Sequence, residues 1–274
     1  MLNVVVVGAF GKMGREVVKA VGAAPNLTVA AVVDVAAGDA GEARTLGVSG
    51  DVLISDSLED ALAFKKSQVM VDFTTPDAVM DNIGMALERG VHAVVGTTGF
   101  SDDDRSSIER QCQKTGSNCL IAANFAIGAI LMMQLSETAS IHFDQVEIVE
   151  RHHEKKADAP SGTAIQTAER IVAAGGPVQA SPSAETVVGA RGADVEGVTV
   201  HSIRLPGLSA HQEVVFGGPG QTLTIKHDVL DRSCYMPGVI LAVRSVGELK
   251  GLTVGIDGIL SSGNGAERGS GGKR

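Results

Sequence analysis

The densest group of ionisable side chains in the sequence lies at residues 151–164, which read RHHEKKADAPSGTA. Two histidines and two lysines stand close together there, in a chain whose formal net charge is −9. A histidine exchanges protons near neutral pH, and a lysine beside other cations gives up its proton more readily. Local positive charge in an acidic protein also suits a dianionic ligand. The stretch therefore predicts acid–base chemistry beside an anion site.

The end of this stretch, Ser161, Gly162 and Thr163, stands where a loop should pass into a helix. Ser161 or Thr163 can cap that helix, and the free N–H groups of its first turn can bind a carboxylate. A solvated charged loop is the alternative interpretation. Paired histidines can also be metal ligands, but neighbours in a strand point to opposite faces and no third ligand is evident, so we expect no metal.

A second group suited to ligand binding is GAFGKMG at residues 8–14, between an apolar run and a helix-like pattern. Gly8, Gly11 and Gly14 permit a tight turn and close approach to a pyrophosphate at the helix N-terminus. Asp34 follows the last glycine by twenty residues, where a carboxylate can accept hydrogen bonds from the adenosine ribose. The pattern predicts a dinucleotide site, with ordinary turn glycines and a surface acid as the alternative.

Asp34 also bears on the choice of cofactor. A carboxylate repels the 2′-phosphate of NADPH, and residues 35–37 include no arginine to hold it, which favours NADH. Lys12 in the glycine turn can reach phosphates, so NADH, NADPH or both are open. The turns at residues 72–76 (DFTTP) and 96–99 (GTTG) follow strand-like runs and suit contact with a nicotinamide or ribose, although ordinary loops carry the same residues.

The elements that must position these groups follow from hydrophobic periodicity. In the first half of the chain, short apolar runs alternate with helix-period segments. We expect strands at residues 2–7, 28–33, 68–73, 91–95 and 119–122, and helices at 12–21, 77–89 and 102–114. Such alternation is typical of a Rossmann-like α/β fold with a doubly wound parallel sheet.

The pattern changes after Asn124. We expect helices at 127–141, 163–174 and 237–246, a loop at 175–197, a hairpin turn at 217–221, and strands at 145–149, 198–205, 211–216 and 222–229. These segments predict a second α/β domain with an open mixed or antiparallel sheet. The dinucleotide-binding domain would comprise residues 1–125, completed by 234–262, the substrate domain residues 126–233, and a disordered tail residues 263–274.

Composition excludes several classes of protein. The 32 acidic and 23 basic residues argue against nucleic-acid binding. The N-terminus lacks the basic region of a signal peptide, and the longest apolar stretch, residues 119–135, is interrupted and short for a membrane span. The three cysteines have no CxxC spacing and are expected to be reduced packing residues. We expect a cytoplasmic protein that binds neither nucleic acid nor membrane.

Together the segments resemble the dihydrodipicolinate (4-hydroxy-tetrahydrodipicolinate) reductase family of diaminopimelate and lysine biosynthesis. The resemblance covers nearly all of residues 1–260 and rests on VGAFGKMG, VDFTTP, VVGTTGF, AANFAIG, ERHHEKKADAPSGTA, GARGADVEGVTVHSIRLPGLSAHQEVVFG and TLTIKHDVLDRSCYMPGV. It implies hydride transfer from NADH or NADPH to a cyclic dicarboxylate imine formed from 4-hydroxy-tetrahydrodipicolinate, which gives tetrahydrodipicolinate. It also implies a homotetramer assembled through the sheet of the second domain.

The resemblance implies roles for single residues. His152 matches the family's proton donor or acceptor and Lys156 its proton donor, while His153, Gly162 and Thr163 match positions that bind the substrate carboxylates. The cofactor-contacting positions are matched by Gly8, Ala9, Phe10, Gly11, Lys12, Met13, Asp34, Gly96, Thr97, Thr98, Ala122, Ala123, Asn124 and Phe125. Two positions depart from the family pattern: Lys155 replaces a further histidine of many members, and Phe10 replaces a basic residue of some.

Two other functions are open on the sequence alone. A Rossmann-fold dehydrogenase of another small diacid would use the glycine turn and a basic loop, but it has no need of the whole HHxxK…SGT pattern. A nucleotide-sensing protein without turnover would keep the fold only.

Overall fold

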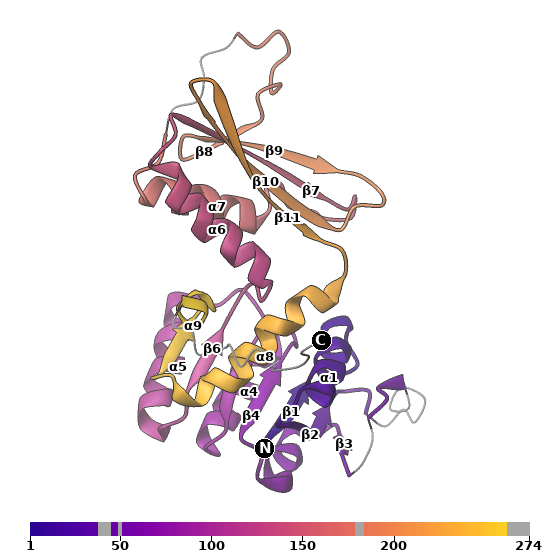
Figure 1. Ribbon diagram of the computed structural model, residues 1–274. Helices are drawn as coiled ribbons and strands as arrows, with labels where there is room; N and C mark the ends of the chain where they lie inside the picture. Colours follow the sequence, from indigo (N-terminus) through magenta and orange to yellow (C-terminus); the bar gives the residue numbers. More distant parts are fainter. Residues whose placement is uncertain (38–44, 49–50, 179–183, 262–274) are drawn as a thin grey trace, which may run out of the picture. The chain divides into compact units, whose positions relative to one another are not determined.

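The computed structural model describes residues 1–37, 45–48, 51–178 and 184–261. The chain divides into two compact units. The first comprises Met1–Ala126 and the segment from Tyr235 onward, and the second comprises Ile127–Cys234. Each unit contains one β-sheet among the described residues, and Figure 1 shows both sheets, with most of their strands labelled.

The sheet of the first unit is parallel, in the order β12-β6-β5-β4-β1-β2-β3. The strands are β1 (Leu2–Val7), β2 (Leu27–Val33), β3 (Leu53–Ser55), β4 (Val69–Asp72), β5 (His92–Val95), β6 (Cys119–Ile121) and β12 (Leu252–Val254). The order reverses at β1, which is the switch point where ligands bind in such sheets. The predicted doubly wound fold is confirmed.

Helices cover both faces of this sheet (Figure 1). On one face α1 (Lys12–Ala23) packs beside α8 (Met236–Ser245), and Val17, Val18 and Val21 form the buried stripe of α1. On the other face lie α3 (Leu58–Ala63), α4 (Pro76–Glu88) and α5 (Asp102–Thr115), whose apolar side chains share one core with alternate residues of the strands. The short elements are η1 (Phe64–Lys66), η3 (Val246–Glu248) and α9 (Asp257–Ser261).

Two polar side chains, Asn118 and Glu109, fix η3 and β12 to the core of the first unit. Asn118 donates from Nδ2 to the carbonyl oxygen of Val246 at 2.9 Å, and its Oδ1 accepts from the amide of Gly251 at 3.2 Å. Glu109 accepts from the amide of Leu252 at 2.6 Å. These bonds align β12 beside β6, so the C-terminal segment completes the sheet that the first 126 residues begin.

The second unit has a mixed five-stranded sheet in the order β11-β10-β7-β9-β8. Its elements are α6 (Ile127–Ser140), β7 (Gln145–His152), α7 (Gly162–Ala173), β8 (Ala193–Val195), β9 (Val198–Arg204), β10 (Ala210–Gly218) and β11 (Gln221–Val229), followed by η2 (Arg232–Tyr235). Strands β7 and β9 are parallel, and the other pairs are antiparallel. The expected open mixed sheet is therefore confirmed.

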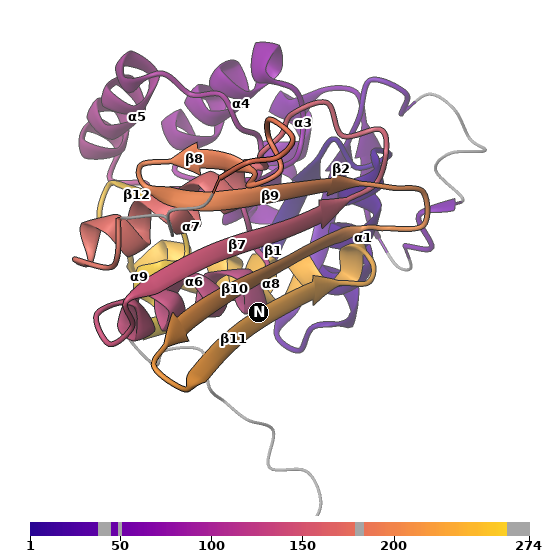
Figure 2. The same cartoon turned by 90° about the horizontal axis from the view of Figure 1, so that it is seen from above.

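The two faces of the second sheet differ in what covers them. Helices α6 and α7 lie on one face, as Figure 2 shows, and bury apolar side chains such as Val146, Ile148 and Phe216. The opposite face carries no described helix, and ion pairs cross its strands, among them Arg151 with Glu213. Alternation of side chains along each strand produces this division.

The structure differs from the sequence-based prediction in several segments. Strand β7 was expected to end at Val149, but it continues through His152, so the charged stretch begins inside the sheet. Strands β3, β8 and β12 and helix α3 were not predicted, because elements of three to six residues show no clear period. The predicted tail at 263–274 lies outside the described residues.

The three cysteines are free thiols that pack against their neighbours. Cys112 and Cys119 are buried free thiols, and Cys234 is half-buried. Burial raises the pKa of the Cys112 thiol to about 11, which keeps it protonated. In the part of the chain that the structure describes, no helix is both long and apolar enough to cross a bilayer.

Candidate active site

The glycine turn between β1 and α1 has no room for a side chain at Gly8 or Gly14. Gly8 has a φ of +74°, and a Cβ atom on it would lie 2.9 Å from the carbonyl oxygen of Phe73. A Cβ atom on Gly14 would lie 2.0 Å from the carbonyl oxygen of Gly8, so α1 packs directly on the turn. Gly11 is the N-cap and has no side chain, which leaves the first-turn N–H groups for a phosphate. The turn fits a dinucleotide pyrophosphate.

Asp34, directly after β2, is hydrogen-bonded to this turn. Its Oδ2 accepts from the amide of Phe10 at 2.8 Å, and its Oδ1 accepts from the amide of Ala36 at 3.1 Å. Arg15 donates from Nε to the carbonyl oxygen of Phe10 at 2.9 Å, and its guanidinium lies 5.8 Å from the centre of the Phe10 ring. Asp34 thus shapes the turn, and Arg15 is a cation there that sequence reasoning missed.

The other predicted cofactor segments follow the ends of neighbouring strands (Figure 1). Gly96, Thr97 and Thr98 follow β5, and Ala122–Phe125 follows β6. Since these strands are parallel to β1 and β2, the segments share one edge of the sheet with the glycine turn and Asp34. Of the predicted set, Ala9, Thr97, Ala122 and Phe125 are buried, Gly8, Phe10, Met13, Asp34, Gly96 and Asn124 are half-buried, and Gly11, Lys12, Thr98 and Ala123 are exposed.

Asp72, at the end of β4, connects two of these loops. Its buried carboxylate accepts from the amide and hydroxyl of Thr74 at 2.8 and 2.7 Å, and from Nδ2 of Asn82 at 2.8 Å. Thr97 donates from its hydroxyl to the carbonyl oxygen of Thr74 at 3.1 Å. Burial raises the pKa of Asp72, because it outweighs these neutral donors. The loops after β4 and β5 are therefore held together.

Phe73 determines the shape of the same edge. A Cβ atom on Gly96 would lie 2.0 Å from Cε1 of Phe73, so only glycine fits beside this ring. The rings of Phe73 and Phe125 are in contact, with centroids 5.8 Å apart. Apolar packing thus brings the loops after β4, β5 and β6 close to one another.

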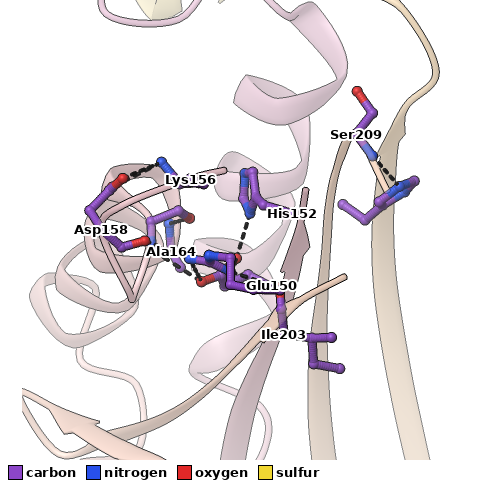
Figure 3. Close-up of polar contacts among 10 residues, drawn as sticks. Glu150, His152, Lys156, Asp158, Ala164, Ile203 and Ser209 are labelled. Carbon is purple, nitrogen blue, oxygen red and sulfur yellow. Dashed lines mark hydrogen bonds and ion pairs between the residues drawn. The ribbon is translucent and has the colours of Figure 1, made fainter. Parts of the chain in front are cut away.

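In the second unit, Glu150 and His152 lie on the covered face of β7 (Figure 3). Glu150 is fully buried, and Nδ1 of His152 lies 2.5 Å from its Oε2. Burial lowers the pKa of His152; Glu150 opposes this effect, and the charges of Lys156 and Arg204 add to it. The imidazole is therefore neutral near pH 7, and its hydrogen bond to a carboxylate assigns the proton to Nδ1. Nε2 is left to exchange protons with a ligand.

Arg204 on β9 pairs with Glu150 through both guanidinium nitrogens. Nη2 donates to Oε1 at 2.8 Å and Nη1 to Oε2 at 2.9 Å. Burial opposes the charge of Glu150, but hydrogen bonds from Arg204, Ser202 and His152 outweigh it and lower the pKa of the carboxyl. Glu150 also accepts from the amide of Ser161 at 3.2 Å. Glu150 is therefore a carboxylate at neutral pH.

Lys156 lies in the loop after β7 and is held by Asp158. Its Nζ contacts both carboxylate oxygens, at 2.8 and 2.9 Å, and this bond keeps the pKa of Asp158 low (Figure 3). Arg204 donates from Nη2 to the carbonyl oxygen of Asp158 at 2.7 Å. The adjacent residues His153, Glu154 and Lys155 are exposed in a turn. Lys156 is thus fixed by contacts, whereas these three side chains extend into solvent.

Helix α7 begins where the sequence predicts. Ser161 is the N-cap, and its hydroxyl accepts from the amide of Ala164 at 3.3 Å. Gly162 is exposed and Thr163 half-buried, so the first turn of α7 is accessible to a carboxylate. Beneath it, the buried Gln212 donates to the hydroxyl of Thr167 at 2.8 Å, which donates to the carbonyl oxygen of Thr163 at 2.7 Å.

Sequence reasoning missed Glu150, Arg204 and Asp72. Glu150 carries a signal that could have identified it, because it continues the buried alternation of Val146 and Ile148 along β7. Arg204 carries none, since it is 54 residues away along the chain. Among the described residues, no cluster of three or more His, Cys, Asp or Glu side chains could hold a metal ion.

Both units are similar to known proteins. Residues 2–125 match the family described as dihydrodipicolinate reductase, N-terminus, and residues 128–260 match dihydrodipicolinate reductase, C-terminus. Proteins named 4-hydroxy-tetrahydrodipicolinate reductase are similar along their whole length. The one from Thermosynechococcus vestitus is 49% identical over 269 residues, covering 94% of this chain and 97% of its own. The one from Mycolicibacterium smegmatis is 48% identical over 262 residues, covering 94% and 99%.

Solved structures agree with these matches. The dipicolinate-bound dihydrodipicolinate reductase from Paenisporosarcina sp. TG-14 has a TM-score of 0.85 and 39% identity, and the comparison covers 94% of this chain and 99% of that one. An amine dehydrogenase from Mycobacterium smegmatis, with a TM-score of 0.64 and 14% identity over 93% and 95% of the two chains, shares the fold alone. On both units, the chain belongs to the dihydrodipicolinate reductase family.

Proposed function

We propose that this protein reduces 4-hydroxy-tetrahydrodipicolinate, with loss of water, to tetrahydrodipicolinate in diaminopimelate and lysine biosynthesis. The observation that carries the proposal is the arrangement in the second unit, where His152, Lys156 and the first turn of α7 are all linked to Glu150 and Arg204. Membership of the family across both units supports it, as does the dipicolinate bound to the solved relative.

The substrate is a small dicarboxylate, and the second unit supplies groups of the right charge for it. The first-turn N–H groups of α7 at Gly162 and Thr163 would hold one carboxylate, because a helix N-terminus favours anions. The exposed imidazole of His153 and the ammonium of Lys156 are hydrogen-bond donors for a second. These donors would allow a chain of net charge −9 to hold a dianion.

The reduction adds one hydride and one proton to the dehydrated ring. NADH or NADPH supplies the hydride when it is bound. Lys156, held in place by Asp158, would donate the proton, and His152 would exchange protons through Nε2. The His152 side chain is suited to this because its burial lowers its pKa toward the neutral form.

The cofactor would lie against the glycine turn of the first unit, with its adenosine ribose near Asp34 and its nicotinamide near the loops after β5 and β6. We infer that both reduced cofactors are used and that NADH is preferred, since the Asp34 carboxylate repels a 2′-phosphate. Arg15 and Lys12 lie in or beside the turn and would offset part of that repulsion.

We infer that the protein is a cytoplasmic homotetramer assembled through the second unit. The face of the sheet opposite α6 and α7 is covered by no described helix and would be available to a second copy of the chain. Sedimentation of the purified protein tests this inference, and a monomer at micromolar concentration would exclude it.

A coupled assay tests the reaction itself. 4-Hydroxy-tetrahydrodipicolinate must be made in the cuvette by a synthase from pyruvate and aspartate semialdehyde, while NADH or NADPH oxidation is followed at 340 nm. We expect oxidation that depends on both substrate and enzyme. Folded protein that binds NADH but shows no substrate-dependent oxidation would support a nucleotide-sensing protein, and oxidation with other diacids only would support a different dehydrogenase.

A further inference from the structure

The pair of Glu150 on β7 and Arg204 on β9 is connected to three parts of the proposed substrate site: His152, the loop that holds Lys156, and the start of α7. Glu150 accepts hydrogen bonds from the His152 ring and from the amide of Ser161, the N-cap of α7. Arg204 donates to the main chain of Asp158, whose carboxylate holds Lys156. Three parts of the site that come from a strand, a loop and a helix therefore share one anchor.

We propose that Glu150 and Arg204 are positioning residues for the reduction. Glu150 fixes the proton of His152 on Nδ1, so that Nε2 is the atom that exchanges protons, and the pair as a whole sets the distances among His152, Lys156 and the first turn of α7. This inference rests on the proposed function and adds two residues to its site.

Each oxygen of Glu150 accepts one hydrogen bond from Arg204 and one from another group of the site. Oε1 accepts from Nη2 of Arg204 at 2.8 Å and from the amide of Ser161 at 3.2 Å. Oε2 accepts from Nη1 of Arg204 at 2.9 Å and from Nδ1 of His152 at 2.5 Å. Two parallel bonds from a rigid guanidinium fix the plane of the carboxylate, and that plane then directs the other two bonds. A single-point cation such as lysine would leave the carboxylate free to rotate.

The carboxylate also determines which nitrogen of His152 carries the proton. A neutral imidazole in water is protonated on either nitrogen, but an acceptor at 2.5 Å selects Nδ1–H. Figure 3 shows the ring directed toward Glu150 from the strand that carries both residues. With Nδ1 occupied, only Nε2 has a lone pair for a ligand.

The charges around His152 determine the direction of the expected effect. The groups that act on it are Glu150 on its own strand, Arg204 on β9, and Lys156 in the following loop. Of these, only Glu150 favours the imidazolium. Removing its charge leaves two cations, so the pKa of His152 should fall further.

The test replaces the charge but keeps the shape, with Glu150→Gln. Glu147→Gln is the matched control, because Glu147 lies on the same strand, pairs with Arg191 and His201, and faces the other side of the sheet. Nitrogen-15 NMR of labelled histidine would follow the titration and tautomer of His152, assigned with His152→Gln. Steady-state kinetics would give the pH profile, and calorimetry the Kd for NADH.

For Glu150→Gln we expect the titration of His152 to move to lower pH and the Nδ1–H tautomer to lose its predominance. We also expect kcat to fall by about tenfold or more, a smaller loss than removal of a general acid or base itself can cause. The Kd for NADH should be unchanged, and Glu147→Gln should match the parent chain. A folded Glu150→Gln protein with an unchanged His152 titration and pH profile would overturn the proposal.

Arg204→Lys provides an independent test, because it keeps the positive charge and removes the two-point contact. We expect KM for the substrate to rise more than kcat falls, since the links to Asp158 and to the start of α7 are loosened while His152 keeps its acceptor. An unchanged KM would contradict the proposal that the pair sets the distances among His152, Lys156 and the first turn of α7. This test remains valid even if the Glu150→Gln protein does not fold. The NMR titration needs no turnover, so it distinguishes failure of this inference from failure of the proposed function.

Discussion

Among the described residues, each unit buries one carboxylate completely, and the two are stabilised in different ways. Asp72 in the first unit accepts from neutral groups of Thr74, Asn82 and Thr97, and burial raises its pKa. Glu150 in the second unit accepts from Arg204 and His152, and these bonds lower its pKa although burial acts in the opposite direction. Neutral donors fix a loop, whereas charged donors also fix a protonation state.

The two units also differ in the groups that they present to a ligand. The first unit presents main-chain N–H groups and hydroxyls, which suit a cofactor that must be bound and released without proton transfer. The second unit presents a histidine and a lysine that each contact a neighbouring carboxylate. Under the proposed function, proton chemistry would be confined to the second unit, and the following experiments test that separation.

The largest effect is expected from replacing Arg204, the ion-pair partner of Glu150. Arg204→Met leaves Glu150 buried and without its ion-pair partner, which should lower the free energy of unfolding by about 3–5 kcal/mol. Urea unfolding followed by circular dichroism measures it. Arg151→Met is the control, because its ion pair with Glu213 lies on the open face and is partly exposed. A loss no larger than that of the control would show that Glu150 does not depend on its charged partner.

Lys156→Ala should affect the chemistry of the second unit and leave cofactor binding intact. We expect kcat to fall by about two orders of magnitude or more, the usual effect of a lost general acid, with the Kd for NADH unchanged. Lys155→Ala, an exposed neighbour without a role in the proposal, is the control. Near-normal turnover of the Lys156 variant would remove that residue from the proton-donor role.

Asp34→Asn tests whether the charge of Asp34 selects between NADH and NADPH. Asparagine keeps an oxygen for the amide of Phe10 but removes the repulsion of a 2′-phosphate. The ratio of kcat/KM for NADH over NADPH should fall by about tenfold, which corresponds to about 1.4 kcal/mol. If the ratio is unchanged, Asp34 does not select the cofactor, and Arg15 becomes the residue to replace.

The smallest effect is expected at Asp72. Asp72→Asn keeps one acceptor for Thr74, and the amide of Asn82 can turn to accept from the new NH₂ group, so the free energy of unfolding should fall by only about 1 kcal/mol. Urea unfolding at neutral pH checks this value. A loss as large as that of Arg204→Met would show that the two carboxylates are not stabilised differently.

The pH dependence of the same variants sharpens the comparison. The raised pKa of Asp72 means that its contribution is complete below its unfolded pKa, about 3.9, and is lost as pH rises through the folded value. The lowered pKa of Glu150 means that its contribution is present above its unfolded pKa, about 4.3, and is lost as pH falls through the folded value. The stability differences from Asp72→Asn and Glu150→Gln should therefore change with pH in opposite directions, and equal slopes would contradict this assignment.

Long periodic elements and short motifs were predictable from the sequence, and long-range polar partners were not. The βα alternation of the first unit, the capping role of Ser161 and the glycine turn follow from local patterns that need no distant partner. The strands β3, β8 and β12 are too short to show a period. Arg204 reaches Glu150 only because β9 lies beside β7 in the sheet, and this neighbour relation is set by tertiary packing.

The alternation of β7 limits which changes the second unit can tolerate. Glu150 and His152 point to the helices, while Glu147 and Arg151 point to the open face, where Arg151 pairs with Glu213. One inserted or deleted residue within this strand would exchange the two faces. It would turn His152 away from α7 and bring Arg151 into the core. Length variation among relatives should therefore be absent from β7, even where substitutions are accepted, and should be found in the loop before it, because the loop after it holds Lys156 and Asp158 in place.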